Sequence, residues 1–207
     1  MSGTPGRRAQ VKVSGAPVAF ITEACTTLLA NTKYQITNPV KGVWDRAIAV
    51  TVFKDAVLQA ANLYTINRLS GTITFLADIG AGHVITVTGS YLPMAAAIEG
   101  KTFSYEITRQ NLDVSAFQAV WITRIESLKD GKCGIGKWKT LDETMSAYVL
   151  AGVPVVVEMG PDTNLAGYGL RMWGLPTKDA VNAVLTNAIE ETVEFVATPD
   201  IDNNIVG

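Results

Sequence analysis

The sequence has few charged residues and almost no histidine. Charged side chains make up 17% of its 207 residues, against a globular average of about 25%, and His83 is the single histidine. A Ser–His–Asp triad or a Cys–His pair would have to include His83, whose position between Gly82 and Val84 is typical of an exposed residue at the start of a strand. A metal site would depend mainly on carboxylates. We therefore expect no catalytic residue, no metal and no cofactor, and predict that the protein is not an enzyme.

Cysteines and long apolar runs are also scarce. Cys25 and Cys133 are the only cysteines, and their spacing is not that of a metal site. We expect two reduced, partly buried thiols, as is usual in a cytosol. No apolar run approaches the roughly 18 residues of a membrane span, and no secretory segment follows the first residues. We expect assembly in the cytoplasm and no membrane partner.

The charges that are present are unevenly distributed. The net charge is -2, which disfavours tight nucleic-acid binding, because that affinity comes mainly from Lys and Arg on phosphates. Arg7, Arg8 and Lys12 precede the first acidic residue, Glu23. After Lys178, in contrast, every charged residue is acidic. These acids are Asp179, Glu190, Glu191, Glu194, Asp200 and Asp202. We predict a flexible basic arm at 1–10, one β-sandwich domain at 11–197 and an acidic arm at 198–207.

Short β-type segments separated by turn signals dominate the chain. The clearest is Tyr64–Phe75, in which apolar residues alternate on both sides of Ser70-Gly71, a pattern that predicts a β-hairpin. A turn is predicted at Lys129-Asp-Gly131, and the apolar run Val155–Met159 predicts a central strand. Further strands are predicted at 11–14, 18–22, 33–37, 47–53, 84–91, 102–108, 120–127, 133–138 and 168–175.

One helix interrupts this pattern. Thr140 and Glu143 form a T-x-x-E capping box, and Gly152 and Pro154 end the helix, so we predict it at about 141–151. The segment 180–197 fits either a helix or strands. A two-residue phase near its end favours strands, although 180–188 stays open. The predicted fold class is mainly β, a two-sheet β-sandwich with one flanking helix.

Two motifs have features of functional sites. The segment Gly131–Lys137 satisfies the G-x-x-x-x-G-K part of a phosphate-binding loop, but Trp138 stands where a hydroxyl should reach magnesium. We interpret it as a glycine-rich hairpin. Glu190 and Glu191 are neighbours, so on a strand they face opposite sides and cannot form a catalytic pair. We expect the four tryptophans to be core or subunit-interface anchors.

The order of several motifs resembles a known family. Tyr64–Phe75 has the form Y-x-I-x-x-x-x-G-x-I-x-F, and Gly82–Pro93 the form G-x-x-I-T-V-x-G-S-Y-L-P. Leu112-Asp-Val-Ser-Ala-Phe117 and a stretch from Trp121 to Gly131 follow, and the chain closes with Ile189–Pro199. This succession is similar to siphophage tail tube proteins, the major tail proteins of long-tailed bacteriophages, over about residues 11–200. Ser127 departs from it, where the family usually has Gly.

The resemblance implies a structural subunit that stacks, as six-membered rings, into a hollow conduit for DNA ejection. Its partners would be further copies of itself, a tape-measure protein and tail-end proteins, with transient, non-specific passage of DNA, and its location would be the virion tail. The basic and acidic arms suggest ring-stacking residues, namely Arg7, Arg8, Lys12, Asp200 and Asp202. A conduit that does not grip phosphates needs a neutral or acidic lining, so we expect some of Glu190, Glu191 and Glu194 to face the lumen.

Two alternatives stay open at this point. The same fold would suit another virion β-protein, such as a distal-tail, baseplate or capsid-decoration component. A phosphate-binding enzyme acting through Gly131–Lys137 is the less favoured alternative.

Overall fold

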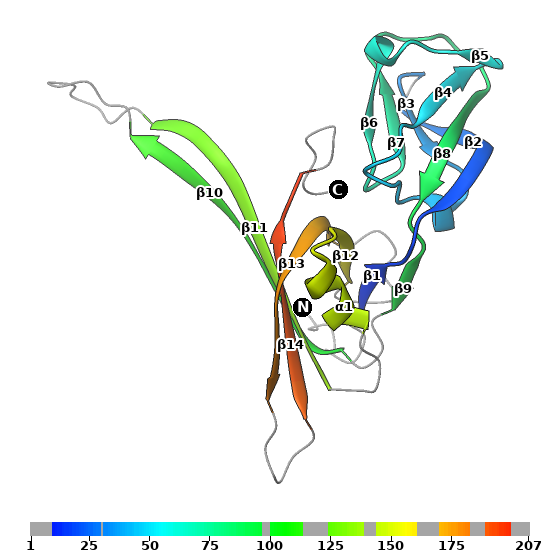
Figure 1. The fold of residues 1–207 in the computed structure, drawn as a ribbon. Helices are drawn as coiled ribbons and strands as arrows, with labels where there is room; N and C mark the ends of the chain where they lie inside the picture. Colours follow the sequence, from blue (N-terminus) through cyan, green and yellow to red (C-terminus); the bar gives the residue numbers. More distant parts are fainter. Residues whose placement is uncertain are drawn as a thin grey trace, which may run out of the picture. The chain divides into compact units, whose positions relative to one another are not determined.

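The computed structural model describes residues 10–29, 31–96, 100–113, 124–138, 144–160, 170–182 and 189–199. It is mainly β, with two curled antiparallel sheets and one α-helix, as the sequence predicts (Figure 1). The chain divides into two compact units. Unit 1 comprises Met1–Ile98, Val155–Trp173 and Thr198–Gly207, and unit 2 comprises Glu99–Pro154 and Gly174–Ala197.

Unit 1 contains a complete seven-stranded antiparallel sheet. In order of hydrogen-bonded neighbours its strands are β5 (Val57–Leu58), β4 (Thr51–Lys54), β8 (Ile85–Tyr91), β2 (Val18–Leu29), β3 (Lys33–Ile36), β7 (Thr72–Phe75) and β6 (Tyr64–Asn67). Two short 3-10 helices, η2 (Pro39–Lys41) and η3 (Ala61–Leu63), lie in its connections. Alternate side chains point into one core that includes Trp44, Val52 and Val87, all fully buried. Trp44 is thus a core residue, one of the two roles expected for the tryptophans.

The predicted hairpin at Tyr64–Phe75 is confirmed as β6 and β7. Tyr64 pairs with Phe75 and Ile66 with Ile73. Gly71 has a φ of 61°, a conformation that only glycine adopts without strain, and it ends the turn. A Cβ at this position would also lie 2.8 Å from the carbonyl oxygen of Gly42. The local turn chemistry therefore determines this hairpin.

The remaining strands of unit 1 belong to the second sheet. β1 (Gln10–Ser14) lies between β12 (Val155–Gly160) and β9 (Met94–Ala96), and Leu170–Trp173 begins β13 (Leu170–Asn182). The second sheet orders β12 between β1 and β13, and Val155–Met159 are all buried, which confirms the predicted central strand. Trp173 packs with Val156 and Leu69 in a second core cluster, so it too is a core residue.

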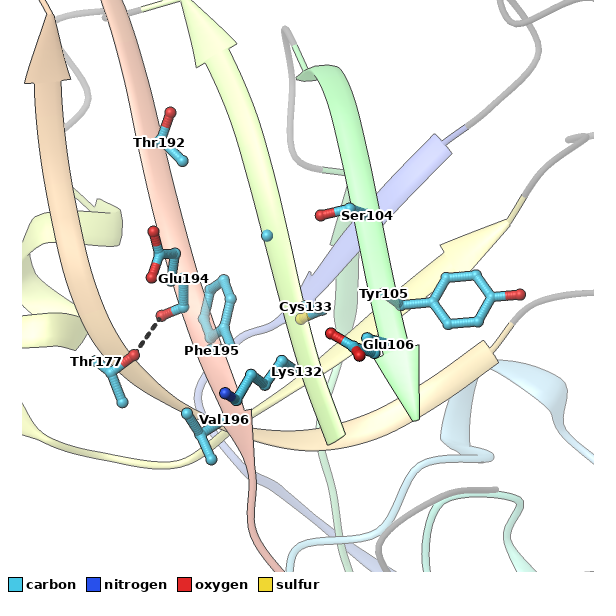
Figure 2. Close-up of a pocket in the computed structure, with 11 residues that line it drawn as sticks. Ser104, Tyr105, Glu106, Lys132, Cys133, Thr177, Thr192, Glu194, Phe195 and Val196 are labelled. Carbon is cyan, nitrogen blue, oxygen red and sulfur yellow. Dashed lines mark hydrogen bonds between the residues drawn. The ribbon is translucent and has the colours of Figure 1, made fainter. Parts of the chain in front are cut away.

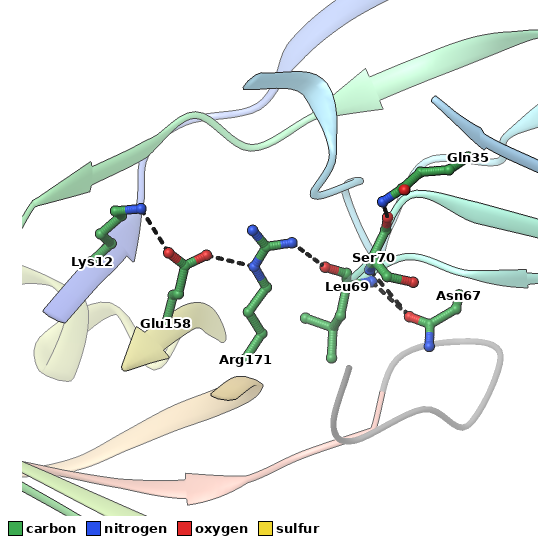
Figure 3. Close-up of polar contacts among 7 residues, drawn as sticks. All are labelled: Lys12, Gln35, Asn67, Leu69, Ser70, Glu158 and Arg171. Atoms are coloured by element: carbon green, nitrogen blue, oxygen red, sulfur yellow. Dashed lines mark hydrogen bonds and ion pairs between the residues drawn. The ribbon is translucent and has the colours of Figure 1, made fainter. Parts of the chain in front are cut away.

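A charged network joins these strands within unit 1 (Figure 3). Glu158 on β12 accepts from Lys12 Nζ at 2.7 Å and from Arg171 Nε at 2.5 Å. Arg171 also donates through Nη1 to the carbonyl oxygen of Leu69 at 3.0 Å, in the β6–β7 turn. Burial alone would raise the pKa of Glu158, but the hydrogen bonds from Lys12 and Arg171 outweigh it and hold the pKa below its ordinary value.

Unit 2 contains four neighbouring antiparallel strands of the second sheet, which has seven strands in all. The neighbour order is β10 (Gly100–Asp113), β11 (Arg124–Trp138), β14 (Glu190–Ala197) and β13, whose part from Gly174 onward belongs to this unit. β10 and β11 form a long curved ribbon (Figure 1). The helix α1 (Thr144–Ala151) is also in this unit, and Gly152 follows it with a φ of 61°, as the predicted stop requires. The capping residues Thr140 and Glu143 lie outside the described residues.

Three sequence predictions on local structure need correction. The turn at Lys129–Gly131 and the hairpin at Gly131–Gly136 are wrong, because β11 runs unbroken from Arg124 to Trp138. Gly131 pairs with Ile107 of β10. The glycines at 134 and 136 are the cross-strand partners of Ser104 and Thr102, whose side chains lie close to them. These glycines serve close strand contacts rather than a turn.

The third correction concerns the strand predicted at 47–53, which begins only at Thr51. Arg68 donates from Nη1 to the carbonyl oxygens of Asp45 and Ile48, both at 2.7 Å. These bonds hold the segment before Thr51 in an irregular conformation. The strand interpretation of 180–197 is confirmed for Ala180–Asn182 and Glu190–Ala197, while 183–188 lie outside the described residues.

Candidate functional site

The last strand of the sheet in unit 2 separates the three predicted lumen residues. Along β14, exposed and buried residues alternate from Glu190 to Phe195. Glu190 and Glu194 are exposed on one face, whereas Glu191 is 1% exposed and lies on the other. The sequence prediction that Glu190 and Glu191 face opposite sides is confirmed.

The strand register extends the exposed face across the whole sheet. Glu194 lies beside Gly134 and Lys178, and Gly134 lies beside Ser104. We call this surface the polar face. Its members are Thr102, Ser104, Glu106, Thr108, Asp130, Lys132, Gly134, Gly136, Lys178, Ala180, Glu190, Thr192 and Glu194, with the apolar Leu175 and Val196 at one end. Four carboxylates against two ammonium groups give the described part of this face a net charge of -2.

Charges on the polar face are arranged in pairs across neighbouring strands. Lys178 Nζ lies 2.8 Å from Glu194 Oε1, between β13 and β14. Glu106 of β10 is the register partner of Lys132 on β11. Both lysines thus have an acidic neighbour, which reduces the attraction of this face for phosphates.

A hollow of about 700 Å³ lies on the polar face (Figure 2). Its lining includes Ser104, Glu106, Lys132, Thr192 and Glu194, together with Thr177, Phe195 and Val196. A Cβ at position 134 would lie 3.2 Å from Ser104 Oγ, and one at position 136 would crowd Thr102. Gly134, which lines the hollow, therefore adds no side chain beside Ser104.

The opposite surface of the sheet is the apolar face. Its members are Phe103, Tyr105, Ile107, Cys133, Ile135, Pro176, Asp179, Val181, Glu191, Val193 and Phe195. The members on the two central strands β11 and β14 are buried. On the end strand β10, Tyr105 is 56% and Ile107 51% exposed, and on β13 Val181 is 51% exposed. The apolar face is thus covered on β11 and β14 and exposed at these three positions.

β10 is an outer strand with an unusual length for its position. Its 14 residues pair with β11 and with no other strand in the described part of the chain. A long edge strand with exposed apolar side chains is a template for pairing with another chain. The sheet therefore offers a polar face, an apolar face and a long pairing edge.

The nucleophile and metal chemistry considered from the sequence finds little support in the geometry. Burial raises the pKa of Cys133 to about 12, and burial, followed by the charge of Glu23, raises that of Cys25 to about 12. Both thiols are thus protonated at neutral pH. The structure brings no group of three His, Cys, Asp or Glu side chains together in metal-binding geometry among the residues it describes.

The histidine and the glycine-lysine motif have local structural partners. His83 Nδ1 lies 2.6 Å from Asp55 Oδ2, and Asp55 Oδ1 accepts from the backbone N–H of Val84 at 2.9 Å. That backbone bond, together with the His83 contact, lowers the pKa of Asp55. Gly131–Lys137 is extended and paired with β10 and β14, so it does not have the geometry of a phosphate-binding loop.

The predicted ring-stacking residues are described only in part. Lys12 is bonded to Glu158 within unit 1, and Arg7, Arg8, Asp200 and Asp202 lie outside the described residues. The start of the acidic arm is anchored, because Arg46 Nη2 donates to the carbonyl oxygen of Pro199 at 2.7 Å. The guanidinium of Arg46 also lies over the Trp173 ring, 5.7 Å from its centre.

Sequence reasoning missed most of the polar face. Glu106, Lys132 and Lys178 were not singled out. The alternation Thr102, Ser104, Glu106, Thr108 within the predicted strand 102–108 was the available signal. Lys132 could not be assigned to a face of the sheet, because the sequence incorrectly predicts a turn at Lys129–Gly131, directly before it.

The sequence matches no protein-family model and no curated protein. No helix in the described part of the chain is long and apolar enough to cross a membrane.

Proposed function

We propose that this chain is the structural subunit of a bacteriophage tail tube, which closes into rings and stacks into a hollow conduit for DNA. The observation that carries the proposal is the sheet of unit 2, with its polar face, its apolar face and the 14-residue edge strand β10. The resemblance in motif order described above supports the same function.

The two faces suit the wall of a tube. A wall needs a wet side that faces the channel and a side that packs against the rest of the subunit. The polar face holds Glu190 and Glu194, and its charges are balanced or slightly acidic. Such a lining repels phosphates weakly and lets DNA slide, because binding to nucleic acid requires unpaired Lys and Arg. We assign Glu190 and Glu194 to the lumen and Glu191 to the packed side.

The edge strand suits ring closure. In a ring of identical subunits the edge strand of each copy pairs with a strand of its neighbour, so that no strand edge is left unpaired. Head-to-tail contacts between rings then repeat along the axis, and the basic and acidic arms would supply complementary charge. The tape-measure protein and the tail-end proteins would be the partners of the assembled tube.

Electron microscopy of the concentrated, purified protein tests the proposal. We expect hollow tubes of uniform width. Deleting residues 1–9 spares β1, which begins at Gln10, and should leave a folded subunit that forms shorter tubes or isolated rings. A protein that stays monomeric at every concentration and salt condition would refute the proposal. Rings or caps that never stack, even with the arm intact, would indicate a different virion component.

A further inference from the structure

A second hollow, of about 630 Å³, lies in unit 1 along the edge of β6. Five consecutive residues, Tyr64–Arg68, line it. Because the side chains of a strand alternate between its two faces, a hollow lined by consecutive residues follows the edge of the strand. β6 is also the last strand of its sheet in the part of the chain that the structure describes. The hollow is therefore a groove beside an edge strand, a shape that suits an extended segment of polypeptide.

The two sides of this groove differ in chemistry. On the outer face of the sheet, Thr65 lies beside Thr74 and Thr74 beside Lys33, and all three line the groove. The apolar part of the lining comes from the core side and from neighbouring loops, namely Ala49, Val50, Ala61 and Ile66. Among the described residues the lining contains the cations Lys33 and Arg68 and no acidic residue. A segment that fits this groove should be acidic on one side and apolar on the other.

The acidic arm has this pattern. After Pro199 the sequence reads Asp200-Ile-Asp-Asn-Asn-Ile-Val-Gly207. In an extended conformation Asp200 and Asp202 point to one side, and the isoleucines at 201 and 205 point to the other. Eight extended residues span at most roughly 26–29 Å, which is enough to follow the four residues of β6 from end to end.

The arm also starts close to the groove. Thr198–Gly207 belong to unit 1, and the carbonyl oxygen of Pro199 accepts from Arg46 Nη2 at 2.7 Å. Arg46 follows Asp45, whose carbonyl oxygen accepts from Nη1 of Arg68 at 2.7 Å. Arg68 is the last of the five consecutive residues that line the groove. A segment that enters at Arg68 and continues toward the start of β6 runs antiparallel to that strand.

We infer that residues 200–207 bind in this groove of their own copy, as an added antiparallel strand at the edge of β6. The two aspartates then lie on the side of Lys33, and the two isoleucines lie on the side of Val50. The bound arm would cover an edge that could otherwise pair with another chain. The inference concerns the single copy and does not rest on the proposed tube. In that tube, the aspartates could bind the basic arm of another ring only after they had left the groove.

Peptide binding to a truncated chain tests the groove. Deleting residues 200–207 keeps Pro199 and its bond to Arg46. A fluorescent peptide with the sequence of residues 200–207 should bind this truncated chain saturably, as measured by anisotropy at 50 mM salt. The unmodified chain should bind the peptide at least tenfold more weakly, because its own arm occupies the groove at a high effective concentration. Near-ultraviolet circular dichroism checks that the truncated chain is folded.

A matched pair of lysine variants tests the charge of the groove. In the truncated chain, K33Q should weaken peptide binding by about threefold at low salt, because an exposed ion pair contributes little. K178Q makes the same change in net charge in unit 2 and should leave peptide binding unchanged. A peptide with both aspartates replaced by asparagine should bind more weakly to the truncated chain and should not distinguish K33Q from unmodified Lys33.

Disulfide trapping tests whether the arm binds its own copy. In T65C/D202C and T65C/N204C both thiols lie on the outer side of the groove, and at least one of these variants should form an intramolecular disulfide on oxidation. In T65C/N203C the second thiol points to the other side, so no bond should form. The single variant T65C reports any reaction with the native thiols. Non-reducing gels and the masses of linked peptides distinguish a bond within one copy from a bond between copies.

Each outcome supports or overturns the inference without bearing on the tube. A folded, truncated chain that does not bind the peptide would overturn it, as would equal binding by the truncated and unmodified chains. A loss in K33Q no larger than in K178Q would overturn the contact with Lys33. Covalent dimers in place of the intramolecular bond would overturn the placement of the arm on its own copy. Microscopy of tubes tests the proposed function separately.

Discussion

Glu158 is the carboxylate that forms ion pairs with two cationic side chains of unit 1. Its side chain is 12% exposed and bonds both Lys12 and Arg171. Replacing it in E158Q leaves two cations around a neutral amide. We expect a loss of about 2 kcal/mol in the free energy of unfolding, below the value for a fully buried pair because Lys12 and Arg171 are about one-third exposed. Urea unfolding at neutral pH measures this.

The depressed pKa of Glu158 makes that loss depend on pH. A carboxylate whose pKa is lower when folded contributes stability above its ordinary pKa, 4.5, and loses it as the pH falls through the lower, folded value. The difference in stability between the unmodified protein and E158Q should therefore be constant above about pH 5 and shrink in more acidic buffer. A difference that grows on acidification would contradict the network.

Gly71 tests the turn of the β6–β7 hairpin. In G71A the new Cβ meets the carbonyl oxygen of Gly42 at 2.8 Å and Ile36 Cγ2 at 3.0 Å, at a φ of 61°. We expect a destabilisation of about 2–3 kcal/mol. Gly82 is a matched control, because its φ is 84° but nothing lies within 4 Å, so G82A should cost about 1 kcal/mol. Equal losses in thermal melts of the two variants would contradict this account.

At the scale of elements, β14 determines which face of the sheet is packed. Val193 is buried between Glu191 and Phe195 on the apolar face, and its neighbour Thr192 is exposed on the polar face. V193D buries a charge without a counter-ion and should cost about 4 kcal/mol or more, whereas T192D should cost less than about 1 kcal/mol. Near-ultraviolet circular dichroism and chemical unfolding compare the two. Similar losses would show that the two faces are not distinct.

The accuracy of the sequence predictions follows the range of the interactions involved. The hairpin at Tyr64–Phe75 was predictable because its alternation and its Gly71 turn are local. The predicted turn at Lys129–Gly131 was wrong because glycine occurs both in turns and at positions where two strands approach closely. In β11 it allows close approach to Ser104 and Thr102 of β10, and those partners lie 30 or more residues away in the sequence.

The candidate site was predictable to the same extent. The two-residue phase of Glu190–Phe195 gave the opposite orientation of Glu190 and Glu191. It could not give the burial of Glu191 or the row that joins Glu194 to Lys178, because these depend on strand order. The irregular segment before Thr51 was likewise hidden, since Arg68 reaches its carbonyl oxygens from a distant part of the chain.

At the scale of the proposed assembly, the polar face would become a property of the tube rather than of the subunit. Six copies would bring every Glu190 and Glu194 to one channel, and a narrow channel focuses the field of like charges. In E190K/E194K each subunit loses two negative charges and gains two positive charges on this face, a change in net charge of four. We expect tubes of this variant to bind a short fluorescent DNA strand at least tenfold more tightly than unmodified tubes at 50 mM salt, with an affinity that falls steeply as salt rises. Fluorescence anisotropy measures the binding.

Dissociated subunits and a neutral variant provide the controls for that experiment. Tubes of E190Q/E194Q should bind DNA with an affinity between those of the unmodified and the E190K/E194K tubes, because they lose the repulsion of the carboxylates without gaining cations. The gain from the lysines should be much smaller for monomers than for tubes, since a single sheet does not surround the strand. Lysines placed at the exposed positions Thr26 and Thr65 of unit 1 should bind DNA equally in monomers and tubes. If E190K/E194K behaved like those surface lysines, with no additional gain on assembly, Glu190 and Glu194 would not line the channel.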